Sequence, residues 1–371
     1  MQIFKQIINE LSSFQELKNC LDNGIQPISV TGVSQIHKAH IIYALERNGT
    51  TLVITDDENN AKKLCYDINE IAGQTLAHAF PSKELTLTNV EGVSREYENI
   101  RLAILSKVCT GECKFLVASI EAALQLTIPK SILINSIITI KQGDEIQIQE
   151  LTRRLVECGY SFCETVEGTS QFSVRGAIVD IFPVQSDFPY RIEFWGDEVD
   201  NISAFDVESQ RRTDSFESVS ITPTLEIIAD RETLAEKIED FAKNVKGKRA
   251  AIVKEKLNND ANRLRNKLHL NNVDKYIHLA YDEPATVFDY ITEAIIFNEY
   301  TNIAEKAKSV LAQHNEDIKL LLDEGELCKG LDSYYLEIAQ FLSLVEKYPQ
   351  IYLDVFMHGS NRINFQKLIN F

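Results

Sequence analysis

The 371-residue sequence lacks the cysteine patterns that mark disulfide frameworks and zinc sites. Its seven cysteines are an odd number, and no Cys-x-x-Cys pair occurs among them. Cys109 and Cys113 lie close together, but no second ligand pair follows at a spacing typical of zinc. We therefore predict free thiols, no bound metal, no cofactor and a reducing, cytoplasmic location.

Long apolar runs and structure-breaking residues are also scarce. No segment approaches the roughly 20 apolar residues that a membrane-spanning helix needs. The helix expected from Met1 is interrupted by Lys5 and Glu10, unlike a signal peptide. With 15 glycines, 8 prolines and no low-complexity tract, long disordered linkers are disfavoured. We expect a soluble protein of two or three domains that does not contact membranes.

Clusters of basic residues are the third absence. The formal net charge is -17, and the longest basic stretch, Lys243 to Lys256, is broken by apolar residues. We interpret this stretch as a helix, a turn and a strand. Non-specific binding to duplex DNA needs several clustered cations. Direct DNA binding is therefore not the leading prediction, although an acidic protein can still carry a local basic groove.

Helix and strand patterns alternate at both ends of the chain. Residues 1–128 and 223–371 show short apolar strands separated by helices, which is typical of a parallel α/β sheet. Residues 129–222 are rich in strands and contain one clear helix, from Ile148 to Cys158. The simplest architecture has the two ends sharing one sheet, with the middle part inserted as an α+β domain.

Periodicity predicts several individual elements. They are helices over 3–23, 259–268 and 331–348, a strand over 250–253, and two antiparallel strands over 172–184 and 189–205 joined by a turn at 185–188. The sequence carries no terminal signal near 366–371, and we expect it to belong to a longer protein.

A glycine-containing loop follows the first predicted strand. From Gly32 to Ala39 it reads G-V-S-Q-I-H-K-A, close to the phosphate-binding pattern G-x-x-x-x-G-K-[ST]. Gly32 and Lys38 fit this pattern. His37 replaces the second glycine, and its Cβ obstructs close approach of the backbone to phosphate. Ala39 lacks the hydroxyl that binds Mg²⁺.

Residues 289–300 match the second half of an ATPase site, an apolar strand that ends in Asp-Glu. Asn298 replaces the aspartate, and Glu299 remains. Because an amide lacks the charge that holds Mg²⁺, we predict no ATP hydrolysis. Nucleotide binding without turnover is a weaker possibility, and neither segment need ever have bound nucleotide. His37 and His40 form H-x-x-H without an evident third ligand, so we expect an ordinary histidine pair.

The inserted part offers a candidate binding surface. Ile192 and Phe194 alternate with Arg191 and Trp195 along one predicted strand. If Ile192 and Phe194 face the core, the chain's only tryptophan lies on the solvent face beside an arginine. Exposed tryptophan and arginine are typical of interaction hot spots.

A second arginine, Arg175, lies on the preceding strand, where antiparallel pairing would bring it near Arg191. Residues 131–222 hold 7 Lys or Arg and 16 Asp or Glu, a net charge of −9. An arginine pair in such surroundings suits a carboxylate-bearing protein better than a nucleic acid. The alternative is that both arginines simply neutralise neighbours such as Glu193 or Asp180.

The same strands carry a family resemblance. Residues 172–183, 190–202 and 205–211 contain R-G-x-x-x-D-I-F-P, R-I-E-F-W-G-D-E-V and F-D-V-E-S-Q-R in that order. Their order and spacing resemble the signature of the domain shared by the excision-repair protein UvrB and the transcription-repair coupling factors (the Mfd family). The resemblance covers essentially the whole chain, as the N-terminal UvrB-like region of the Mfd family.

The resemblance implies a degenerate RecA/helicase-like sheet domain with an inserted UvrA-binding-type domain. It implies a non-catalytic module that recruits UvrA during transcription-coupled DNA repair. By matching positions, the UvrA contacts would be Arg175, Arg191 and Trp195, although phenylalanine is commoner at the position of Trp195. The family binds RNA polymerase and DNA through regions that this chain does not contain.

The alternative function is a nucleotide-dependent, helicase-like ATPase of the UvrB type that acts on damaged DNA. It rests on Lys38 and Glu299. UvrB carries a long, aromatic-rich hairpin for separating DNA strands where this chain has only the short segment 80–108. This difference favours the docking function.

Overall fold

The computed structural model describes residues 2–89, 94–266, 268, 270–356, 363 and 365–371. Both ends of the chain build one seven-stranded sheet, in the order β15-β1-β14-β13-β2-β4-β3, and each neighbouring pair is parallel. The strands are β1 (Ile28–Thr31), β2 (Thr51–Thr55), β3 (Ala77–Phe80), β4 (Phe115–Ser119), β13 (Ile295–Asn298), β14 (Gln350–Leu353) and β15 (Lys367–Asn370). The predicted α/β class, with a sheet shared by the two ends, is confirmed.

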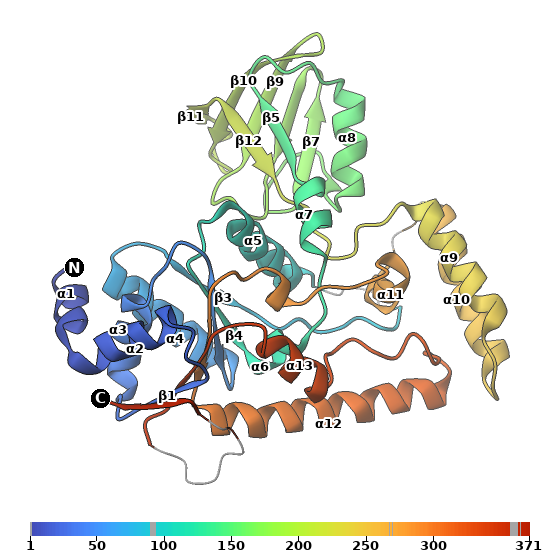
Figure 1. Ribbon diagram of the computed structural model, residues 1–371. Coiled ribbons are helices and arrows are strands. Elements are labelled where there is room, and N and C mark those ends of the chain that lie inside the picture. The colour runs from blue at the N-terminus through green and yellow to red at the C-terminus, as the bar shows by residue number, and fades with distance from the viewer. Residues whose placement is uncertain (1, 90–93, 267, 269, 357–362, 364) are drawn as a thin grey trace.

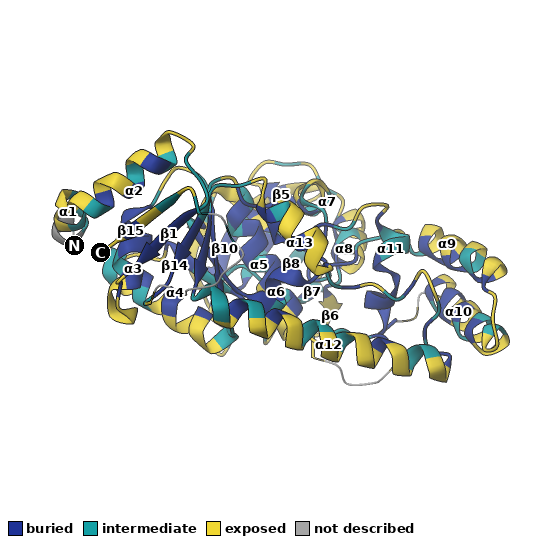
Figure 2. Ribbon diagram, turned by 60° about the horizontal axis from the view of Figure 1, so that its bottom comes forward, coloured by how far each residue is buried: buried dark blue, intermediate teal, exposed yellow. Residues whose placement is uncertain are grey.

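In the central strands of the sheet, alternate residues face two separate cores. On β2, Val53 packs on one face of the sheet, whereas Leu52 and Ile54 pack on the other. Strands buried on both faces read as continuous apolar runs, and Figure 2 shows them as the buried centre of the molecule. One face is covered by α1 (Gln2–Glu10), α2 (Ser12–Asp22), α3 (Gln35–Ala44) and α4 (Glu58–Ala72), and the other by α5 (Glu96–Thr110), α6 (Ile120–Leu124), α12 (Tyr300–Glu324) and α13 (Ile338–Val345).

Helices α9 (Arg231–Asn244) and α10 (Ala250–Arg265) form an arm that stands apart from the sheet (Figure 1). The strand predicted over 250–253 is wrong, because this segment is the first turn of α10. Val253, Leu257 and Ala261 are buried at four-residue spacing and continue one helical face. The short elements η1 (Val273–Tyr276), α11 (Ile277–Ala280) and η2 (Val287–Asp289) connect the arm to β13.

Two other predicted helices have the wrong extent. The helix expected over 3–23 is divided into α1 and α2 by Leu11, whose backbone is extended. Of the helix expected over 331–348, only α13 forms, and a capping box between Glu337 and Gln340 starts it. The 25-residue α12 is not among the predicted elements, because few of its residues are buried and its amphipathic pattern is weak.

The middle of the chain folds around a third core. A six-stranded sheet, in the order β11-β10-β9-β8-β7-β6, is antiparallel except for the pair β6 and β7. Leu151 and Leu155 on α8 pack against its apolar face. The elements are α7 (Lys130–Ser136), β5 (Ile138–Lys141), α8 (Ile148–Glu157), β6 (Ser161–Phe162), β7 (Gln171–Arg175), β8 (Ile178–Ile181), β9 (Tyr190–Trp195), β10 (Glu198–Phe205), β11 (Arg212–Phe216) and β12 (Ser218–Ile221).

This unit stands at one end of the molecule, beyond α5 (Figure 1). β5 and β12 pair with each other as a separate two-stranded sheet. The domain boundaries at 128/129 and 222/223 stay predictions. Among the residues that the structure describes, none of the helices combines the length and apolar character that crossing a bilayer requires.

Candidate functional site

Two tight hairpins build the candidate surface. β7 and β8 turn at Gly176 with φ 63°, and β9 and β10 turn at Gly196 with φ 66°. Glycine adopts this left-handed backbone without the steric cost of a Cβ. The prediction of single strands over 172–184 and 189–205 is therefore wrong, because each segment folds back on itself at its glycine. The turn predicted at 185–188 lies in the link between the two hairpins.

Trp195 lies on the solvent face of β9, with 82% of its surface exposed. Ile192 and Phe194 are buried in the core below, so the predicted alternation along this strand is confirmed. Trp195 is paired with Glu198 across the second hairpin. The neighbouring Phe194 N–H donates to the carbonyl of Ala177, at 2.9 Å. The indole therefore lies close to the turns of both hairpins.

A buried carboxylate joins the two predicted arginines. Asp180 accepts from Arg191 Nε at 2.7 Å and from Arg191 Nη2 at 2.8 Å. Arg175 Nη2 also donates to the Asp180 carboxylate. The side chain of Asp180 is 1% exposed, whereas that of Arg175 is 47% exposed. The pairing of the strands thus brings the two arginines together. Both of them also contact Asp180, as the alternative interpretation, neutralisation of this carboxylate, predicts.

Arg191 is fixed from several sides. Its guanidinium donates to the backbone carbonyl of Gln210 at 3.1 Å and to the Gln210 side-chain oxygen at 3.2 Å. It also lies over the ring of Phe205, 4.6 Å from the centroid. The hydrogen bonds to Asp180 raise the pKa of Arg191 above its usual value. Since only 12% of this side chain is exposed, Arg175 and Trp195 supply most of the accessible surface.

Three further residues belong to this surface: Gln210 and Arg212 are missing from the prediction, and Asp180 enters it only as a neighbour that the arginines neutralise. Asp180 and Gln210 hold Arg191, and Arg212 on β11 forms an ion pair with Glu193 on β9. The register between strands places them, and that register is not readable from one sequence. For Asp180 a signal exists, because it is the aspartate of the R-G-x-x-x-D segment.

The glycine-containing loop lies at the carboxyl end of β1. Gly32 has φ 83°, and an added Cβ would lie 2.6 Å from both the Asn370 side-chain oxygen and the Phe371 carbonyl. The Gly32 N–H donates to the carbonyl of Val355, at 3.2 Å. Residues at the carboxyl ends of β14 and β15 therefore pack directly on the loop.

Lys38 meets the second predicted ATPase segment. Its fully buried ammonium donates to Asn298 Oδ1 at 2.8 Å and forms an ion pair with Glu299. Burial lowers the pKa of Lys38, and the contact with Glu299 opposes this effect. The Glu299 carboxylate also accepts from the backbone N–H of Val355, at 3.0 Å. To reach a phosphate, Lys38 would have to give up both side-chain contacts.

The remaining predicted residues of the loop surround this contact. Ala39 is buried in the helix face of α3. The His37 ring lies 3.0 Å from the Ser34 hydroxyl and 6.1 Å, between centroids, from the ring of His40. Across the described ranges, no group of three or more His, Cys, Asp or Glu is placed to hold a metal ion.

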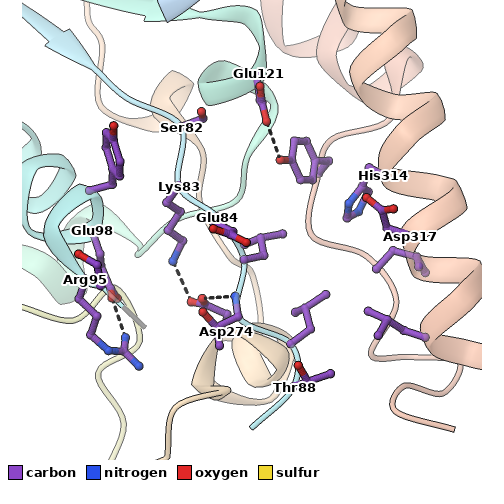
Figure 3. Close-up of a pocket in the computed structure, with 18 of the residues that line it drawn as sticks. Ser82, Lys83, Glu84, Thr88, Arg95, Glu98, Glu121, Asp274, His314 and Asp317 are labelled. Carbon is purple, nitrogen blue, oxygen red and sulfur yellow. Dashed lines mark hydrogen bonds and ion pairs between the residues drawn. The ribbon is translucent and has the colours of Figure 1, made fainter. Parts of the chain in front are cut away.

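A cleft of about 740 Å³ lies between the segment after β3 and helix α12, and the sequence analysis does not predict it (Figure 3). Both cations of its lining are engaged, since Lys83 reaches Asp274 at 2.8 Å and Arg95 reaches Glu98 at 2.6 Å. The carboxylates in the lining are Glu58, Glu84, Glu98, Glu121, Asp274 and Asp317. Because carboxylates outnumber cations, the cleft repels phosphates.

A buried ion network adjoins this cleft. Glu226 contacts Arg101 at 2.5 Å and Lys83 at 3.2 Å, and all three side chains are almost completely buried. Burial alone would raise the pKa of Glu226, but Arg101 and Lys83 outweigh it and lower this pKa. Burial alone would lower the pKa of Lys83, but Asp274 and Glu226 raise it. The network ties α5, the segment after β3 and the segment after β12 together.

Comparison with known proteins identifies relatives of the whole chain and of the inserted part. Residues 138–226 match the family model of the UvrB interaction domain. The chain is 28% identical over 384 residues to the transcription-repair-coupling factor of Bacillus subtilis, covering 100% of this chain and 32% of the relative. The corresponding factor of Staphylococcus haemolyticus is 26% identical, with 100% and 32% covered, and that of Staphylococcus aureus (strain MRSA252) is 26% identical, with 96% and 31% covered.

The chain spans about a third of the length of these relatives. The matched domain contains both hairpins, Asp180 and all three predicted surface residues. The earlier resemblance, drawn from the signature strands, is therefore confirmed. Over its whole length the chain is similar to the N-terminal region of the transcription-repair-coupling factors, and its residues 138–226 are similar to the UvrB interaction domain.

Proposed function

We propose that this chain is a non-catalytic docking module that recruits UvrA during transcription-coupled DNA repair in the cytoplasm. The relatives' name and the match to the UvrB interaction domain support this role. The observation that carries the proposal is the exposed Trp195, which shares the outward face of the inserted sheet with the half-exposed Arg175. RNA polymerase and DNA would be contacted through parts of the relatives outside the matched third.

Charge supports a protein partner that carries carboxylates. Asp180 is shared by two guanidinium groups, so one positive charge remains uncompensated at the surface. The surrounding domain is acidic, which makes this positive charge local and selective. Arginine also binds carboxylates in a bidentate geometry, which adds directional specificity.

Charge reversal at Arg175 tests the proposal. Titration of UvrA with the Arg175→Glu variant, followed by calorimetry, is expected to show about 10- to 100-fold weaker binding than the wild-type chain. A carboxylate at this half-exposed position would repel the partner's carboxylates. Arg153→Glu is the matched control, because Arg153 is an exposed, ion-paired arginine on α8 of the same unit. Equal affinities for the wild type and both variants would remove Arg175 from the interface.

Arg191 is less suitable for this test. Both arginines contact the buried Asp180, but only 12% of the Arg191 side chain is exposed, so a glutamate there would stay against Asp180 and would lower stability as well as affinity. At the 47% exposed position 175 a glutamate can turn into solvent. The combined Arg175→Glu and Arg191→Glu variant is therefore informative only with a thermal unfolding measurement beside it.

The alternative, a UvrB-type ATPase, is favoured by one observation, the meeting of Lys38 with Asn298 and Glu299 at the carboxyl edge of the sheet. We expect phosphate release from ATP, with or without DNA, to be the same for the wild type and for Lys38→Met. The reason is that Lys38 is held by protein groups and the loop lacks its hydroxyl at Ala39. DNA-stimulated release that disappears in Lys38→Met would instead establish the ATPase.

Binding of nucleotide without hydrolysis is measured separately. The anisotropy of a fluorescent ATP analogue is expected to stay constant as the chain is added. A saturable rise that Lys38→Met abolishes would mean that the loop still binds nucleotide.

A further inference from the structure

The longest basic stretch of the sequence folds at the tip of the helical arm. Between Lys243 and Lys256, six Lys or Arg stand against one acidic residue, Glu255, in a chain with a net charge of -17. The predicted helix, turn and strand are in fact the end of α9, a turn and the start of α10. The turn lies at the outer end of the arm (Figure 1).

A groove of about 570 Å³ separates this turn from the loop that follows α12. Lys246, Lys248 and Arg249 line it from the turn, and Lys329 lines it from the opposite loop. All four side chains are exposed. Among the described residues that line the groove, Asp323 alone is acidic. The groove therefore has a strong excess of positive charge.

These four cations differ from their neighbours in the same stretch. Lys243 pairs with Asp240 at 2.6 Å, and Lys256 pairs with Glu326 at 2.5 Å. In the part of the chain that the structure describes, Lys246, Lys248, Arg249 and Lys329 make no ion pair. The flanking cations stabilise the fold, since Lys256 ties α10 to the loop after α12. The groove cations are available to a ligand.

The floor and the size of the groove decide which polyanion fits. Val245, Val253 and Leu327 form an apolar floor. The described lining contains no aromatic ring, although stacking on aromatic rings is the usual way to hold the bases of a single strand. The volume is in the range of sites for small ligands, and is too small to enclose a duplex. A short peptide with carboxylates and apolar side chains satisfies all three features.

We propose that this groove docks an acidic segment of a partner protein. Carboxylates of the segment would contact Lys246, Lys248, Arg249 and Lys329, and an apolar side chain would lie on the floor. The arm of α9 and α10 lies away from β9, the strand that carries Trp195 (Figure 1). The proposal is therefore independent of the UvrA interface.

A fluorescein-labelled peptide of alternating glutamate and leucine is the probe. Its anisotropy is measured with the wild-type chain and with the triple variant Lys246→Glu, Lys248→Glu and Arg249→Glu. We expect at least about tenfold weaker binding to the variant. We also expect weaker binding to the wild type as salt rises from about 50 mM to about 200 mM, since exposed charges are screened.

The matched control is Lys306→Glu with Lys308→Glu, two exposed lysines on α12 outside the groove. It is expected to bind the probe within about twofold of the wild type, since long-range effects of surface charge are screened. Equal binding by the triple variant and the wild type would overturn the proposal. So would preferential binding of a single-stranded oligonucleotide, or equal binding of a lysine-leucine peptide. The Lys329→Ala variant shortens one exposed side chain on the opposite wall of the groove. Its affinity for the probe is a second test of the site, and we expect it to be lower than that of the wild type.

Discussion

The Arg101→Met variant is expected to lose about 3–5 kcal/mol of unfolding free energy, the loss typical of a buried ion pair from which one partner is removed. Arg101 is completely buried, donates to Glu226 at 2.5 Å and to the Pro81 carbonyl at 2.9 Å, and lies over the Phe80 ring. Methionine fills much of the space but leaves Glu226 with Lys83 alone. Denaturation by urea, followed by circular dichroism, measures the loss.

The pH dependence of this variant supplies an internal check. In the wild type the pKa of Glu226 is lowered, so its contribution to stability is present above the unfolded pKa and is lost as pH falls. Without Arg101 the charged form is penalised, so the difference between variant and wild type should shrink as pH approaches about 4. Arg153→Met removes an exposed arginine with two ion pairs and is expected to cost much less than Arg101→Met, because solvent screens exposed ion pairs. If Arg101→Met and Arg153→Met lost the same unfolding free energy, burial would not be the reason why the Arg101 ion pair stabilises the fold.

The Trp195→Ala variant is expected to bind UvrA about 30- to 1000-fold more weakly, a loss of about 2–4 kcal/mol typical of a central tryptophan hot spot. With 82% of its surface exposed, Trp195 contributes little to the core. The free energy of unfolding should therefore change by less than about 0.5 kcal/mol. Calorimetric titration with UvrA and thermal unfolding of the free chain measure the two quantities.

A conservative substitution sharpens this test. Trp195→Phe should retain most of the affinity, since an aromatic ring remains at the tip of the hairpin. Tyr66→Ala removes an exposed aromatic side chain on α4, outside the inserted unit, and should leave affinity unchanged. If Trp195→Ala bound as tightly as Tyr66→Ala, the indole would not belong to the interface.

The parallel sheet could be predicted because its strands are short apolar runs separated by helices. The same signal failed where a helix has few buried residues. Residues 250–253 are apolar, and a four-residue window cannot distinguish a strand from the first turn of α10. For α12, buried residues such as Ile303 and Ala307 are too few over its length to give a clear amphipathic period.

At the candidate surface, alternation alone was enough to place Trp195 outside and Phe194 inside. The sequence could not show that Asp180 lies between Arg175 and Arg191, because a contact between strands depends on their register. The two turns at Gly176 and Gly196 set that register, and a single glycine within an apolar run does not by itself predict a hairpin. The acidic cleft escaped prediction for a related reason, since its carboxylates come from segments as distant as Glu58 and Asp317.

The order of strands in the large sheet also affects how the chain can fold during synthesis. β1 lies between β14 and β15, and β2 lies beside β13. These early strands can pair with those neighbours only after the last part of the chain has been synthesised. The inserted unit has no such dependence, because its strands pair only with one another, from β5 to β12. It can form its core while the large sheet still lacks its C-terminal strands. In the nascent chain, the surface around Trp195 can therefore form before β13, β14 and β15 complete the large sheet.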